Sequence, residues 1–206
     1  MSRLLLSLGL MLCCGLAHAF GLEELRKQLS EPEVIKGPFI QEKHLRALPQ
    51  PLVSNGQFVL ARDHGLLWLL QTPLKQDYRL NATGIARRDA SGWQVIPTRT
   101  AGTEQNKLFF AVLQGDSSGL ERDFELALHG DAKDWKLDLT PRSLVLKQIF
   151  ERIEIHGGRF VDRIELKETQ GDSTVLRMPS STSASLTDAE RHDLCLLYTS
   201  PSPRDA

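Results

Sequence analysis

Apolar residues along most of this chain recur at every second position, which is the period of a strand with one buried face. In the stretch WKLDLTP, residues 135–141, three apolar side chains lie on one side, and Lys136 and Asp138 lie on the other. The same alternation occurs in GQFVLAR, LLWLLQ, RDFELALHG and STVLRMP. RIEIHGGRFVDRIELKE reads as a hairpin with Gly157-Gly158 as its turn. The pattern predicts a mainly antiparallel sheet of many strands.

Helical spacing is confined to a few segments. GLEELRKQLSE places Leu22, Leu25 and Leu29 on one stripe, which predicts a short amphipathic helix before the first strand. Two more helices are predicted, one over residues 104–113 and a shorter one after Pro141 in RSLVLKQIF. The fold class predicted is therefore mainly β, with a few helices inserted.

The alternation also predicts which apolar side chains share the interior face of the sheet. They are Phe58, Leu60, Leu66, Trp68, Leu70, Phe124, Leu126, Trp135, Leu137 and Leu139. Arg62 has the same parity as Phe58 and Leu60, so it would point into the same interior, where a guanidinium needs hydrogen-bond acceptors. The alternative for each apolar residue is that it simply fills a closed core. The alternative for Arg62 is that it lies at an edge of the sheet, in solvent.

The N-terminal segment has the order of a secretory signal. Arg3 precedes an apolar run from Leu4 to Leu16, and Ala17-His18-Ala19 then supplies a small-x-small cleavage site. Cys13 and Cys14 follow Leu12 and Cys13, where a lipobox would have Gly or Ala. We expect residues 1–19 to be removed after Ala19 and the chain to be exported without a lipid anchor.

The C-terminal segment CLLYTSPSPRDA looks foreign to the protein. Its back-translation resembles a transposase adapter used in sequencing libraries, so we interpret residues 195–206 as an adapter artefact; the alternative is a disordered Ser/Pro-rich tail. Residues 20–194 then form a single domain without cysteine. The Ser-rich stretch 180–185 is predicted to be a short loop, and TDAE at 187–190 is a capping box whose helix we expect to be lost to truncation.

Composition and motifs remove several classes of function. The chain has 206 residues and a formal net charge of -1, which argues against a nucleic-acid binder. It contains no G-x-S-x-G, H-E-x-x-H, P-loop or G-x-G-x-x-G motif, so we expect no enzymatic activity, no metal and no cofactor. His44, His64, His129 and His156 are expected to be solvated or hydrogen-bonded and not metal ligands, because none has a His or a carboxylate at ligand spacing.

Charged residues in the strands occupy the positions opposite the apolar ones. They are Asp123, Glu125, Lys136, Glu154, Asp162, Arg163 and Glu165. Paired catalytic carboxylates are the alternative, but strict alternation is typical of the solvated face of a sheet.

The order of the motifs resembles a known family. In GQFVLARDHGLLWLLQTP a strand begins with Gly56, an arginine and a tight link follow, and a second strand contains Trp68 and ends at Pro73. The leading helix and GPFIQEKHL precede it; WKLDLTP, a short helix and FERIEIHGGRFVDRIELKET follow. From about Phe20 to Met178 this order resembles the outer-membrane lipoprotein carrier (LolA-type) family. Asp63 departs from it, since the family usually has proline there.

The resemblance implies a half-open antiparallel β-barrel, LolA/LolB-like, in which short helices form a lid over an apolar cavity for acyl chains. Arg62 matches the family arginine that is held to the lid in the closed state. The interior residues named above would then be the lipid-binding residues.

The function implied is that of a monomeric periplasmic carrier. It would shield the acyl chains of lipoproteins and deliver them from an inner-membrane donor complex toward an outer-membrane acceptor. A soluble periplasmic carrier or sensor of another lipid with the same fold is the alternative.

Overall fold

The computed structural model describes residues 20–81, 84–97, 111–113 and 117–194. The helices are α1 (Leu22–Ser30), α3 (Ser117–Asp123), α4 (Leu144–Lys147) and α5 (Asp188–Asp193). The strands are β1 (Val34–His44), β2 (Leu52–Ala61), β3 (Gly65–Thr72), β4 (Gln76–Asn81), β5 (Gly84–Asp89), β6 (Gly92–Ile96), β7 (Phe124–Asp131), β8 (Asp134–Pro141), β9 (Phe150–Gly157), β10 (Val161–Glu168), β11 (Ser173–Arg177) and β12 (Thr182–Ser183).

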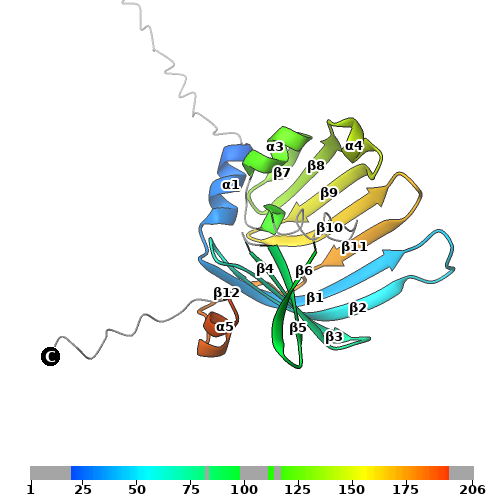
Figure 1. Cartoon of the computed structure of the whole chain (residues 1–206). Coiled ribbons are helices and arrows are strands. Elements are labelled where there is room, and N and C mark those ends of the chain that lie inside the picture. The colour runs from blue at the N-terminus through cyan, green and yellow to red at the C-terminus, as the bar shows by residue number, and fades with distance from the viewer. Residues whose placement is uncertain (1–19, 82–83, 98–110, 114–116, 195–206) are drawn as a thin grey trace, which may run out of the picture.

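The strands form one antiparallel sheet that curls without closing. Its order is β6-β5-β4-β3-β2-β1-β11-β10-β9-β8-β7, and β12 pairs with β1. Figure 1 shows the curved sheet, with α1 and α3 lying over its hollow side next to β7. Within the described residues, the edge strands β6 and β7 do not pair with each other. The prediction of a mainly antiparallel, incompletely closed barrel is therefore confirmed.

The inner face of the sheet is the hydrophobic core. Register places Leu137 opposite Ile155, and Ile155 opposite Ile164, so apolar residues of neighbouring strands form continuous rows. Ile153, Ile155, Ile164 and Leu176 are fully buried on this face. Burial of such rows, at about 25 cal/mol per Å² of apolar surface, is the main force that keeps the sheet curled.

Gly56 is required by close packing in this core. A Cβ atom at this position would lie 2.0 Å from the carbonyl oxygen of Leu69 and 2.9 Å from the ring of Phe39. Gly56, the first residue of the sequence GQFVLAR, is therefore required for β2 to pack against β3.

Several predicted elements differ from the observed ones. Gly157 is the last residue of β9, and the hairpin loop is 158–160, because a register shift follows Val161. The predicted Ser-rich loop contains β12, which pairs with Ile35 and Lys36 of β1. The predicted helix 104–113 lies mostly outside the described residues, which include only 111–113 as helix. α3 was not predicted, and Asp123 ends this helix instead of lying on the sheet.

The expected loss of the last helix was wrong. Thr187 Oγ1 accepts a hydrogen bond from the Glu190 amide at 3.3 Å, and the Glu190 carboxylate accepts one from the Thr187 amide at 2.6 Å, so the capping box forms. α5 packs on the outer face of the sheet, where Leu194 joins a second apolar cluster with Val59 and Leu67. This contact buries Leu194 to 3% exposure.

Candidate functional site

A small apolar cavity lies inside the half-barrel, beneath α1. Its volume is about 30 Å³, which is room for about two water molecules. It is lined by Leu22, Leu25, Arg26, Leu29, Val112, Leu120, Leu126, Trp135, Leu137 and Ile155. Since all of these but Arg26 are apolar, the cavity suits a hydrocarbon ligand, but the state described is too tightly packed to hold one.

Helix α1 forms the outer wall of this cavity because its apolar stripe faces inward. Leu25 and Leu29 are buried to 3% and 7% exposure, as their spacing of four residues predicts. Glu23 and Glu24 lie in the first turn, where carboxylates are favourable near the helix N-terminus. The predicted amphipathic helix is confirmed, and its apolar face covers the cavity.

Arg62 holds the C-terminal end of α1. Its Nη2 donates to the carbonyl oxygens of Leu29 at 2.6 Å and Pro32 at 3.0 Å, and its Nε donates to Pro32 at 3.2 Å. The backbone amide of Arg62 also donates to the Glu33 carbonyl at 2.9 Å. The Leu29 carbonyl lies at the negative end of the helix, so a cation is well placed there, and Pro32 and Glu33 follow just beyond the helix end.

The tight β2–β3 turn positions Arg62. Asp63 has a φ of 59°, which proline cannot adopt, so the residue that departs from the family pattern suits this turn. Partial burial lowers the pKa of Arg62, and the nearby Asp63 carboxylate partly offsets this effect. A guanidinium keeps its charge at neutral pH even so.

Arg62 differs in one respect from its prediction. It does not point into the interior core that contains Phe58 and Leu60, because it lies one residue beyond the end of β2. It borders instead an open groove of about 570 Å³ between the β2–β3 turn and the segment before α5. The acceptors of the Arg62 guanidinium are nevertheless the carbonyl oxygens of Leu29 and Pro32, at and just beyond the end of α1.

A second contact holds α1 to the other half of the sheet. Gln28 Nε2 donates to the carbonyl oxygen of Gly158 at 2.5 Å, in the loop between β9 and β10. Trp135 Nε1 donates to the same oxygen at 2.7 Å. α1 therefore bridges the β2–β3 turn and the β9–β10 loop. The sequence analysis missed Gln28, because nothing in the local pattern distinguishes it from a solvated glutamine.

The ten predicted interior residues all pack in or against the main core cluster. Three of them, Leu126, Trp135 and Leu137, also line the cavity. Trp68 stacks on Phe39 with ring centroids 3.7 Å apart, and neither residue lines the cavity. The α1 leucines, Val112, Leu120 and Ile155 are cavity residues that were not predicted as ligand contacts, because cavity membership depends on how α1 and α3 pack.

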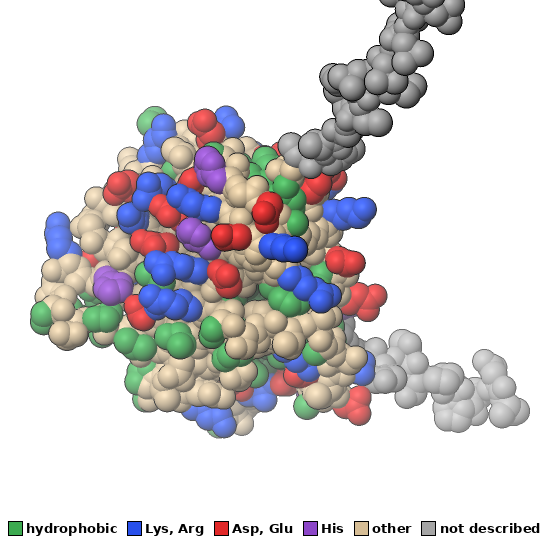
Figure 2. Space-filling view, turned by 180° about the vertical axis from the view of Figure 1, so that it is seen from behind, with side chains coloured by type: hydrophobic (Ala, Val, Ile, Leu, Met, Phe, Trp, Pro, Cys, Tyr) green, Lys and Arg blue, Asp and Glu red, His purple; other side chains and the backbone are tan. Residues whose placement is uncertain are grey.

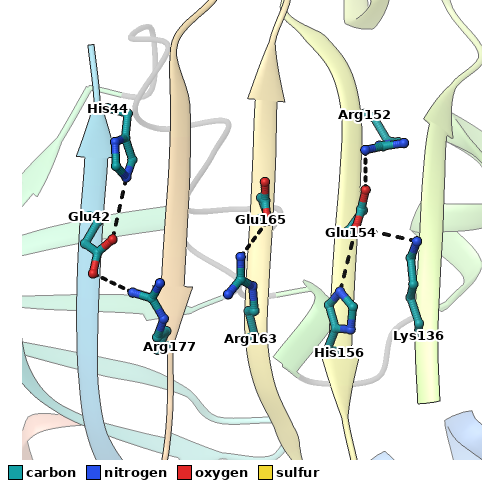
Figure 3. A network of polar contacts seen from close by, with 9 residues as sticks. All are labelled: Glu42, His44, Lys136, Arg152, Glu154, His156, Arg163, Glu165 and Arg177. Atoms are coloured by element: carbon teal, nitrogen blue, oxygen red, sulfur yellow. Dashed lines mark hydrogen bonds and ion pairs between the residues drawn. The ribbon is translucent and has the colours of Figure 1, made fainter. Parts of the chain in front are cut away.

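The outer face of the sheet carries charges in rows across the strands, as Figures 2 and 3 show. Directly opposed residues from β7 to β11 form a basic row of His129, Lys136, His156, Arg163 and Arg177. Two positions along, an acidic row contains Asp138, Glu154 and Glu165, with Glu42 beyond Val175. The prediction of a polar outer face is confirmed for the strand residues.

Ion pairs connect these rows. Arg163 contacts Glu165 at 2.7 Å and lowers the pKa of that carboxyl, and Lys136 lies 3.5 Å from Glu154 (Figure 3). Three of the four histidines considered in the sequence analysis, His44, His129 and His156, have a carboxylate neighbour, which was not expected; His129 and Asp138, for example, are 3.4 Å apart. The described residues contain no group of three His, Cys, Asp or Glu side chains able to hold a metal.

A curved antiparallel sheet, open along one side and closed over an apolar cavity by a helix, defines the structural class. The sequence also matches the family described as outer membrane lipoprotein carrier protein LolA-like over residues 15–196. The chain belongs to this LolA-like family.

Solved structures are similar to this chain at low sequence identity. MucB has a TM-score of 0.52 and 13% identity, with 82% of this chain and 61% of MucB covered. The MucA/MucB complex of Pseudomonas aeruginosa gives a TM-score of 0.49 and 15% identity, covering 82% of this chain and 58% of the other. A LolA superfamily protein from Nitrosomonas europaea gives 0.47 and 11%, covering 82% and 94%. No curated protein matches the sequence.

Proposed function

We propose that this protein is a periplasmic carrier that shields the acyl chains of lipoproteins and delivers them toward the outer membrane. The observation that carries the proposal is the apolar cavity beneath α1, a helix whose polar margins are held by Arg62 and Gln28. Membership of the LolA-like family supports the same function. The donor is then an inner-membrane complex, and the acceptor lies at the outer membrane.

Loading requires α1 to move, because a cavity of about 30 Å³ cannot receive an acyl chain. Moving α1 exposes Leu25 and Leu29, at about 1.5–3 kcal/mol each. Each buried methylene contributes about 0.8 kcal/mol, so roughly four to eight methylenes offset the exposure of both leucines. Opening also breaks the hydrogen bonds of Arg62 and Gln28, so a longer stretch of acyl chain is needed to offset the whole cost of moving α1.

Native mass spectrometry of the protein purified from its periplasm tests this function directly. An acylated polypeptide bound at equal stoichiometry is the expected result. A bound free lipid would favour the alternative, a carrier or sensor of another lipid. Protein that carries no ligand and does not bind fluorescent fatty acid would contradict both functions.

A matched pair of variants localises the binding. Leu137→Glu places a charge in the cavity wall and should abolish fatty-acid binding, since a buried carboxylate is strongly unfavourable next to hydrocarbon. Val95→Glu is the control, because Val95 is 75% exposed on β6 and should leave binding unchanged. Circular dichroism establishes that both variants keep the sheet.

A further inference from the structure

Exposed apolar side chains gather at one end of the half-barrel. Antiparallel pairing brings the β1–β2, β3–β4 and β8–β9 connections to this end, on the right of Figure 1. Large exposed apolar side chains in or beside these connections are Leu48 (46%), Leu52 (52%), Val53 (50%), Leu74 (78%), Leu144 (79%) and Val145 (67%). We call the three connections, residues 44–52, 73–75 and 142–148, the apolar rim.

The charge of the apolar rim is one-sided. Its three segments contain four Lys or Arg residues and one His, and they contain no Asp or Glu: His44, Arg46, Lys75, Arg142 and Lys147. Leu74 is followed directly by Lys75, and Val145 precedes Lys147 by two positions. Each segment therefore combines apolar side chains with a cation.

Acidic residues of neighbouring elements also lie at this end, among them Asp123 at the end of α3 and Glu168 at the end of β10. The β10–β11 turn contains Asp172, whose carboxylate accepts a hydrogen bond from the Arg46 amide at 2.8 Å. In the β5–β6 turn the carboxylate of Asp89 accepts hydrogen bonds from Ser91. Asp123 forms an ion pair with Arg122 at 2.9 Å, so the carboxylates of Asp89, Asp123 and Asp172 all contact neighbouring residues of the protein.

The opposite end of the half-barrel has a different composition. Its described connections, residues 31–33, 62–64, 132–133 and 158–160, contain acidic residues as well as cations. None of the large exposed apolar residues of the described chain lies in them. Large exposed apolar side chains are therefore characteristic of the connections at the apolar rim and not of the connections of this sheet in general.

We propose that the apolar rim binds the surface of an anionic phospholipid membrane. Apolar tips on three separate connections can enter the interface of a bilayer together, while the adjacent cations contact lipid phosphates. A protein partner would need a separate groove for each tip, whereas a membrane presents one deformable surface. No helix in the described part of the chain is long and apolar enough to cross a bilayer. This inference goes beyond the proposed function, because it concerns empty protein as well as loaded protein.

Flotation of the full chain with vesicles of phosphatidylethanolamine and phosphatidylglycerol tests the proposal. Wild-type protein should float with these vesicles, bind phosphatidylcholine vesicles more weakly, and be released by salt. Leu74→Ser combined with Leu144→Ser should lower the partition coefficient roughly tenfold or more. Val95→Ser is the matched control, because Val95 is 75% exposed on β6 and lies outside the apolar rim, and it should not change the partition coefficient.

A second pair of variants tests the cations. Lys75→Gln with Lys147→Gln should remove the preference for anionic vesicles, whereas Lys133→Gln with Arg159→Gln, at the opposite end, should keep it. Equal flotation of the rim and control variants would overturn the proposal, as would wild-type protein that floats with no vesicle. A dimer that the leucine substitutions dissociate, without vesicle binding, would assign the apolar rim to self-association and overturn it as well.

The two proposals fail separately. Fatty-acid binding without flotation would refute membrane binding by the apolar rim and leave the carrier function standing. Flotation with vesicles, but no bound lipid or acylated polypeptide in native mass spectra, would refute the carrier function and leave membrane binding by the apolar rim standing.

Discussion

Replacing Arg62 with leucine removes the contact between the β2–β3 turn and the end of α1. Among the described contacts, the Arg62 guanidinium donates three hydrogen bonds to the carbonyls of Leu29 and Pro32, at 2.6, 3.0 and 3.2 Å. Hydrogen bonds from charged donors contribute about 1.5–3 kcal/mol each, but two of these share Nη2 and the side chain is only half-buried. We therefore assign about 2–4 kcal/mol to the set, which corresponds to about a 30- to 1000-fold shift from closed toward open.

The shift should appear in ligand binding with a definite sign. If only the open state binds acyl chains, apparent affinity is proportional to the open fraction, so Arg62→Leu should bind fluorescent fatty acid more tightly. Release to acceptor vesicles should slow, because the closed state no longer competes well with the ligand. Hydrogen exchange of the α1 amides, measured without ligand, should quicken by a similar factor.

The control is Arg159→Leu, which changes an exposed cation at the same end of the half-barrel whose ring contact is with Phe160. Its exchange rates and affinity should match those of the wild type. Arg62→Leu protein that folds, but keeps wild-type exchange in α1 and wild-type affinity, would refute the role of Arg62 in holding α1.

Three further predictions concern other contacts. Gln28→Leu should open α1 by about 0.5–1.5 kcal/mol, less than Arg62→Leu because its donor is neutral, and the exchange rates of α1 measure this. Trp68→Glu should weaken fatty-acid binding at equilibrium, since it places a charge on the inner face beside Phe39, and unchanged affinity in a folded variant would contradict this. Burial alone would raise the pKa of Glu190, but hydrogen bonds from Lys36 and Thr187 lower it below its ordinary 4.5. The stability that Glu190 gives to α5 should be complete above pH 4.5 and should be lost as the pH falls through the lowered pKa. Hydrogen exchange of the α5 amides, corrected for intrinsic rates, should show this loss in the wild type. The Glu190→Gln variant should show no such pH dependence.

The local pattern of the sequence determined much of the fold. Strict alternation identified the inner face, because one side of each strand faces the apolar core and the other faces water, whichever strand lies next to it. Leu25 and Leu29 identified the inward face of α1, and Thr187 with Glu190 identified the start of α5, because both signals depend on residues within one helical turn. The order of such motifs was sufficient to indicate the LolA-like family that the family match confirms.

The tertiary structure determined which of those elements contact one another, and through which residues. Gln28 and Gly158 are 130 residues apart, and their hydrogen bond depends on how α1 crosses the sheet. Which interior residues line the cavity depends in the same way on the packing of α1 and α3. The apolar rim unites connections that are distant in sequence, because antiparallel pairing returns every second connection to the same end. Long-range register and closure set these contacts, and no periodicity within a single segment encodes them.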